Sequence, residues 1–194
     1  TCDITATKAG DSNYNAASDG PKSVALSPAS QTITFAQPTS PAAYGATFSI
    51  APTASSGLTV TVVATGGCTL LTGVVTMTSS STACTLTANQ AGNNNYSAAP
   101  AVVRTVSAGL ANQVGFTLTV PSGVTFGATG TASTSGGSGG GAVTYSAGSS
   151  TGCTIDANTG VITVTDASGT CDITATKAGD SNYNAASDGP KSVA

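Results

Sequence analysis

The sequence of 194 residues has no glutamate, no histidine and no tryptophan, and only 7% of its residues are charged. A typical soluble domain has about 25%. Its four lysines and one arginine are scattered and the net charge is −3, so no basic cluster is available to bind nucleic acid or an anionic membrane. No apolar run reaches the length of about 18 residues that a membrane-spanning helix needs. We therefore expect neither a nucleic-acid partner nor a membrane span in this segment.

The lack of histidine and glutamate also argues against an enzyme, because the many serine and threonine hydroxyls then have no ordinary general base. A lysine-based dyad is the alternative, but no catalytic motif surrounds the four lysines, Lys8, Lys22, Lys177 and Lys191. The glycine run GGSGGG at 136–141 is not followed by the GK[ST] of a phosphate-binding loop. We expect no catalytic residues, no cofactor and no metal.

The sequence is instead rich in threonine, serine, alanine, glycine and valine, and its apolar residues (39%) recur with period 2 in short stretches. Such alternation is typical of half-buried strands, and no stretch shows an apolar stripe of helical period. The sequence therefore predicts an all-β chain. The stretches expected as strands are 32–35, 47–50, 58–62, 74–77, 84–87, 102–106, 116–120, 143–145, 161–164 and 171–174.

Five cysteines are present, at positions 2, 68, 84, 153 and 171. Cys68 and Cys84 are 16 residues apart, and Cys153 and Cys171 are 18 apart. Paired cysteines at matched spacing indicate two disulfides and an oxidising compartment. Zinc is the alternative, but there is no CxxC pair and no histidine to complete a site. We expect the disulfides Cys68–Cys84 and Cys153–Cys171, with Cys2 equivalent to Cys171 and its partner beyond the start of the sequence.

The first 25 residues, TCDITATKAGDSNYNAASDGPKSVA, are identical to residues 170–194, which indicates a repeat with a period of 169 residues. The period divides again, because 67–100 matches 152–187. We predict two homologous domains, 26–109 and 110–194, preceded by 1–25 as the C-terminal strands of an earlier unit. About seven short strands in each domain is the size of an immunoglobulin-like sandwich.

Three sequence features recur in both predicted domains: YGAT or FGAT (44–47 and 126–129), a Gly-Cys-Thr hairpin, and the block AG(D/N)xNYxAA. Their combination resembles the bacterial immunoglobulin-like tandem repeats of large secreted adhesins and surface fibre proteins, and the last block is the most distinctive. The resemblance implies tandem immunoglobulin-like β-sandwiches, with two full domains and the C-terminal strands of a preceding one. It also implies a stalk, fibre or adhesin built from sandwiches in series.

The tyrosines of the AG(D/N)xNYxAA block, Tyr14, Tyr96 and Tyr183, are expected to form a structural corner. In such a corner the ring is buried and the hydroxyl bonds to the backbone.

The oxygen-rich loop after Lys177 offers Asp180, Asn182, Asn184 and Asp188, and calcium prefers such ligands. The matching loop AGNNNYSAAP has no carboxylate, so we favour a structural turn over a calcium site. The same comparison favours a hairpin turn at DANTG (156–160), since the matching LLTG has no acidic residue.

Taken with the cysteine pairs, the resemblance implies a disulfide-clamped structural segment of an extracellular bacterial fibre or adhesin stalk at the cell surface. Its expected partners are neighbouring copies of the same repeat or chain. The alternative is an adhesion module that binds a surface glycan or a host protein through its loop tips. A Lys–Asn isopeptide cross-link is disfavoured, because Gln90 stands where Lys177 stands in the second domain.

Residues 1–25 supply only the last two strands of a sandwich, and alone they cannot bury Ile4, Tyr14 and Val24. We expect either an upstream segment of the chain or a neighbouring molecule to complete them.

Overall fold

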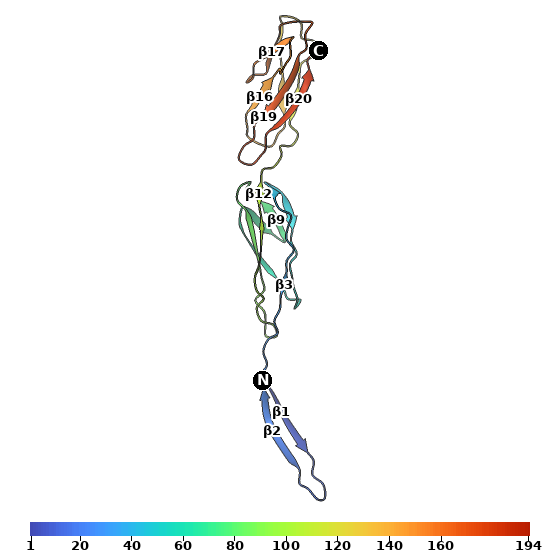
Figure 1. The fold of residues 1–194 in the computed structure, drawn as a ribbon, viewed down its shortest axis with the longest axis vertical. Coiled ribbons are helices and arrows are strands. Elements are labelled where there is room, and N and C mark those ends of the chain that lie inside the picture. The colour runs from blue at the N-terminus through green and yellow to red at the C-terminus, as the bar shows by residue number, and fades with distance from the viewer. The chain divides into compact units, whose positions relative to one another are not determined.

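The computed structural model describes all 194 residues and shows an all-β chain without helices (Figure 1). It contains no helix with the length and apolar character that crossing a membrane requires. Its strands are β1 (Cys2–Lys8), β2 (Ala17–Val24), β3 (Ile33–Thr34), β4 (Ala42–Ala43), β5 (Thr47–Ser49), β6 (Thr53–Ala54), β7 (Thr61–Gly66), β8 (Cys68–Leu71), β9 (Val74–Met77), β10 (Cys84–Asn89), β11 (Val102–Val106), β12 (Ala108–Gly109), β13 (Thr117–Thr119), β14 (Thr129–Thr131), β15 (Ser133–Ser135), β16 (Val143–Ser146), β17 (Cys153–Ile155), β18 (Val161–Val164), β19 (Asp172–Lys177) and β20 (Ala186–Ser192).

Residues pack into two compact units. The first comprises Thr1–Ala36, Ala51–Val62 and Thr87–Val103, and the second comprises Gln37–Ile50, Val63–Leu86 and Arg104–Ala194. This division differs from the sequence repeats, because its boundaries fall within β7, β10 and β11. The domains 26–109 and 110–194 stay a prediction.

The two sequence repeats nevertheless have the same sheet topology. The three-stranded order β5-β9-β8 in the first corresponds to β14-β18-β17 in the second, and β7-β10-β11 corresponds to β16-β19-β20. The pair β3-β6 likewise corresponds to β13-β15. The first repeat has one further pair, the short parallel β4-β12. The two sequence repeats thus form the same small sheets. Such sheets are the layers from which an all-β sandwich is built.

Buried apolar side chains alternate with polar ones along β10 and β19, and the buried ones form the core of each repeat. In β10 every second side chain is buried, namely Cys84, Leu86 and Ala88, and in β19 the buried ones are Ile173 and Ala175. The side chains between them are largely threonines, which the pleat turns to the opposite face. In the second repeat these residues form one apolar cluster with Leu118, Ala132, Cys153 and Ile162.

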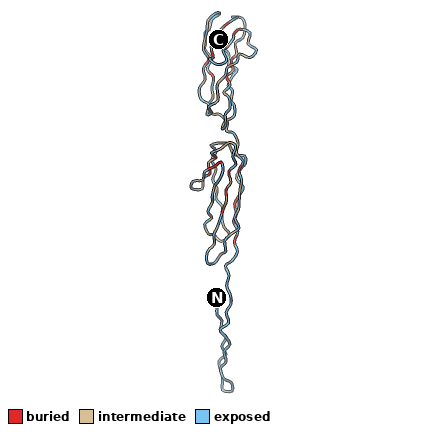
Figure 2. Tube along the Cα trace, turned by 90° about the vertical axis from the view of Figure 1, so that its left-hand side faces the viewer, coloured by how far each residue is buried: buried red, intermediate tan, exposed pale blue.

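The hairpin β1–β2 lacks such a cluster. Every residue of Thr1–Ala25 is exposed, and Figure 2 shows this hairpin in the colour of exposed residues along its whole length. Ile4, which is equivalent to Ile173 by the repeat of 169, is 56% exposed, whereas Ile173 is fully buried. The same sequence therefore has two environments in one chain.

Candidate functional site

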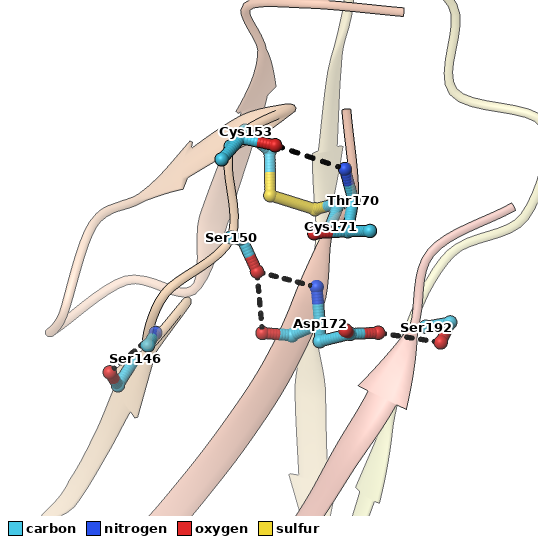
Figure 3. Close-up of a disulfide and its surroundings, with 9 residues drawn as sticks. Ser146, Ser150, Cys153, Thr170, Cys171, Asp172 and Ser192 are labelled. Atoms are coloured by element: carbon cyan, nitrogen blue, oxygen red, sulfur yellow. Dashed lines mark hydrogen bonds between the residues drawn. A yellow bond between two sulfur atoms is a disulfide. The ribbon is translucent and has the colours of Figure 1, made fainter. Parts of the chain in front are cut away.

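The second repeat carries the disulfide Cys153–Cys171, whose Cα atoms are 5.4 Å apart. Cys153 begins β17 and Cys171 directly precedes β19, so the bond joins strands of two different sheets (Figure 3). Cys153 is 5% exposed and belongs to the apolar cluster. The bond closes a loop of 18 residues that contains the whole β17–β18 hairpin.

The first repeat has the equivalent disulfide Cys68–Cys84, with Cα atoms 5.3 Å apart. Cys68 begins β8 and Cys84 begins β10, and both are buried. These are the two pairs expected from the cysteine spacing. Cys2 is the single free cysteine and is exposed.

Hydrogen bonds around Asp172 reinforce the clamp in the second repeat. The Ser150 hydroxyl accepts from the Asp172 N–H at 2.8 Å and donates to its carbonyl at 3.2 Å. The Ser192 hydroxyl donates to the Asp172 carboxylate at 2.6 Å, which ties β20 to β19 (Figure 3). The start of β19 is thus fixed to two neighbouring segments besides the disulfide.

The tyrosine loop has the same backbone conformation in all three copies. The N–H of Asp11, Asn93 or Asp180 donates to the carbonyl of the tyrosine three residues later, at 2.8, 2.8 and 3.0 Å. The side-chain oxygen of the same residue accepts the N–H groups two and three residues on. Asparagine and aspartate are interchangeable in this turn because only the Oδ1 acceptor is needed.

This loop also holds the beginning of its own repeat. Ala29 donates to the Asn95 carbonyl at 2.8 Å and accepts from the Ser97 N–H at 2.9 Å. Ala111 makes the same pair of bonds with Asn182 and Asn184, at 2.9 and 2.8 Å. In each repeat, a residue near the start is therefore fixed to the loop that precedes β11 or β20.

The tyrosine rings differ from the corner expected from the sequence. Tyr96 and Tyr183 are half-buried rather than buried, and Tyr14 is 76% exposed. No tyrosine hydroxyl takes part in a hydrogen bond to the backbone, because the loop is held by main-chain bonds and Asx oxygens instead. The Tyr183 ring meets the edge of the Tyr44 ring, with centroids 5.7 Å apart.

The carboxylates of the oxygen-rich loop are engaged by backbone amides. Asp180 Oδ1 accepts from Asn182 and Tyr183, and Oδ2 accepts from the Gly140 N–H at 2.7 Å. The amide donors, led by Asn182 and then Gly140, lower the pKa of Asp180 below its usual value. The structure contains no cluster of three acidic, histidine or cysteine side chains arranged to hold a metal. These bonds give the loop the geometry of a structural turn.

The DANTG segment closes the β17–β18 hairpin. Asp156 Oδ1 accepts the N–H groups of Asn158 and Thr159 at 3.0 and 2.8 Å, and the Asp156 N–H donates to the Val161 carbonyl. Bonds from Thr159, first from its N–H and then from its hydroxyl, lower the pKa of Asp156. The carboxylate therefore acts as part of the turn.

Sequence reasoning missed the link between β20 and β13. The Asp188 carboxylate accepts the Leu118 N–H at 2.7 Å, and Lys191 Nζ donates to the Leu118 carbonyl at 2.6 Å. Lys191 and Asp188 also form an ion pair at 2.7 Å. The hydrogen bond from Lys191, followed by that from Leu118, lowers the pKa of Asp188. The one available signal was the i,i+3 spacing of the two charges, and no local pattern points to a partner 70 residues away.

The disulfides, hydrogen bonds and ion pair described above therefore hold strands and turns together. A cavity of about 330 Å³ lies beside the disulfide of the second repeat, lined by Gly152 and Cys171 and by residues within 124–126, 164–169 and 193–194. Comparison with known proteins adds no relative: no family model matches the chain, and no curated protein matches it.

Proposed function

We propose that this chain is a structural segment of an extracellular bacterial fibre or adhesin stalk, built from tandem immunoglobulin-like β-sandwiches. The observation that carries the proposal is the recurrence of one arrangement. Both repeats have the same sheet order, one disulfide at the start of the central strand, and one tyrosine loop that holds the start of the repeat. Units of one kind joined in series lengthen a chain without a new fold, which suits a stalk or fibre.

The positions of the disulfides suit a segment under tension. Each one ties the first strand of a hairpin to the central strand that follows it, so the 16- or 18-residue loop between the cysteines cannot extend while the bond is intact. The bonds also fit an oxidising environment. Together with the low charge of the chain, they support the extracellular location that we propose.

Force spectroscopy on the chain, pulled from its two ends, tests this role. Under oxidising conditions we expect two unfolding events that each leave a disulfide loop closed. A reducing agent should increase the chain length released in these two events by roughly 50 and 60 Å, at about 3.5 Å per released residue. Cys68→Ser/Cys84→Ser is the matched control. In this variant, reduction should still increase the released length of the second repeat and should no longer change that of the first. Extension without resistance in the oxidised chain would contradict a load-bearing role.

The cavity of about 330 Å³ favours the second candidate, an adhesion module that binds a glycan or a protein. Phe126 lines it and is 68% exposed, and an exposed aromatic ring beside a hollow is a common element of binding sites. A glycan array probed with the chain and with Phe126→Ala separates the two candidates. A structural segment should show no saturable binding, whereas binding that Phe126→Ala abolishes would favour the adhesion module.

A further inference from the structure

The junction between the two sequence repeats lies inside the second of the two compact units. Residues 107–109 lead from the first repeat into the second. They are not a free linker, because Ala108–Gly109 form strand β12, which pairs in parallel with β4 (Ala42–Ala43). The chain therefore stays attached to the first repeat as far as Gly109.

Two main-chain anchors leave a single residue between the repeats. On the side of the first repeat, the Tyr44 N–H donates to the Gly109 carbonyl at 2.8 Å. On the side of the second, the Ala111 N–H donates to the Asn182 carbonyl at 2.9 Å. Leu110 lies between these anchors, and one residue has two soft backbone dihedral angles. Motion of one repeat against the other is thereby concentrated in Leu110 and the bonds that adjoin it.

The tyrosine loop of the second repeat (178–185) also contacts side chains of the first repeat. The edge of the Tyr183 ring meets the Tyr44 ring, with centroids 5.7 Å apart and planes at 78°, which is a favourable aromatic geometry. The Ser80 hydroxyl donates a hydrogen bond to the Ser181 carbonyl. Two contacts of the loop therefore accompany the main-chain link.

Both sides of this contact are ordered by bonds of their own repeat. Ser80 follows Ser79, whose hydroxyl accepts the N–H groups two and three residues on, at 3.2 and 2.9 Å. Tyr44 precedes Gly45, whose N–H donates to the Met77 carbonyl at 2.9 Å. The Asx turn described above orders the tyrosine loop. Because neither surface has to be ordered by the contact itself, the entropic cost of making it is small.

We infer that the tyrosine loop of the second repeat is a docking element whose partner is the first repeat. The loop binds Tyr44 through Tyr183 and Ser80 through Ser181. These contacts restrict rotation about Leu110, so that the joint between the repeats is fixed rather than hinged. This inference does not rest on the proposed function, because it follows from contacts within one compact unit.

Docking couples the stability of the two repeats. The tyrosine loop is held within its own repeat by the bonds of Asn182 and Asn184 to Ala111, and the Tyr44 ring adds a contact from the other repeat. An edge-to-face aromatic pair changes an equilibrium constant by about twofold to tenfold. A substitution in the first repeat should therefore make the loop of the second repeat open more often.

Hydrogen exchange of the full chain, followed by mass spectrometry, tests this coupling. Tyr44→Ala should raise the exchange rate of the amides in 179–185 by about threefold or more, whereas Tyr44→Phe, which keeps the ring, should not. Tyr96→Ala is the matched control, because it removes the equivalent tyrosine of the first repeat, and it should leave these amides unchanged. No rise in Tyr44→Ala, or the same rise in either of the other variants, would overturn the docking element.

A second experiment uses the unaltered chain, in case Tyr44→Ala does not fold. Residual dipolar couplings of the amides in β5-β9-β8 and in β14-β18-β17 should fit one alignment tensor, as two parts joined without a hinge require. In Tyr44→Ala/Ser80→Ala, the two sheets should need tensors of different magnitude. Different magnitudes in the unaltered chain would contradict a fixed joint. A single tensor in both chains would show that the main chain alone fixes the joint, and would contradict the docking role of the loop.

Discussion

Ile4 and Ile173 are the same residue in the same local sequence, yet one is 56% exposed and the other fully buried. The local sequence determines that both lie in a strand with the same register. The neighbouring strands determine which of them contributes to stability. This pair therefore separates strand formation from burial within one molecule.

At this scale we predict that Ile173→Ala lowers the free energy of unfolding of the second repeat by about 3 kcal/mol, because it removes a fully buried side chain. Ile4→Ala, the matched control, should change it by less than about 0.5 kcal/mol. Chemical denaturation of both variants measures the difference. Equal effects would mean that the first hairpin is buried against a partner in solution.

The Asp188 carboxylate makes the second repeat sensitive to acid. Its pKa is lowered in the folded state, chiefly by the Lys191 hydrogen bond and then by the Leu118 N–H. The stabilisation is therefore complete above the unfolded-state pKa of about 3.9 and is lost as the pH falls through the lower folded-state value. Asp188→Asn should lower the unfolding midpoint at pH 7 and flatten its fall below pH 4.

Asp19→Asn is the matched control for this acid effect, because the Asp19 side chain contacts Lys22 alone in an exposed ion pair. Urea unfolding at pH 7, 4 and 2.5 compares the two variants. The same midpoint shift for both would contradict the stabilising role of the Leu118 link.

Among the elements, the disulfides are expected to contribute most per bond. Closing a loop of 16 to 18 residues stabilises a fold by about 3 kcal/mol in the chain-entropy estimate. Cys153→Ser/Cys171→Ser should therefore lower the unfolding free energy of the second repeat by about that amount. Cys2→Ser should leave it unchanged, because Cys2 is free. Denaturation without reductant measures both, and a loss below about 1 kcal/mol would argue against a clamp.

Alternation alone predicted β9, β11 and β18 with their bounds, and cysteine spacing predicted both disulfides. The sequence also led us to expect a strand at 58–62, whereas β7 runs over Thr61–Gly66. The last strand of the second repeat was expected without bounds, and β20 (Ala186–Ser192) contains Gly189 and Pro190, two residue types that are depleted in strands. They are tolerated because β20 is the edge strand of its sheet.

The candidate site was predictable only where its contacts are local. The turns at Asp156 and Asp180 follow from neighbours two and three residues away. The Asp188–Leu118 bond and the half-burial of Tyr183 depend on segments brought together by the sheets. A single sequence contains no pattern for such pairings.

For the whole molecule, the two halves of residues 26–194 share one topology, and residues 1–25 repeat the end of the second half. Each repeat has the same disulfide and the same tyrosine loop. A chain of such repeats becomes longer when further repeats are added. The proposed function is therefore one of length and resistance to tension.

Immunogold electron microscopy of the producing cells, with antibodies against residues 110–169, tests the central claim most directly. The proposed stalk or fibre predicts gold particles outside the cell, at several positions along filaments or projections. The spacing should recur along each filament, because the proposed fibre contains one copy of residues 110–169 in every period of 169 residues. Gold particles confined to the cell interior, or to a single point at the tip of each projection, would contradict a structural segment.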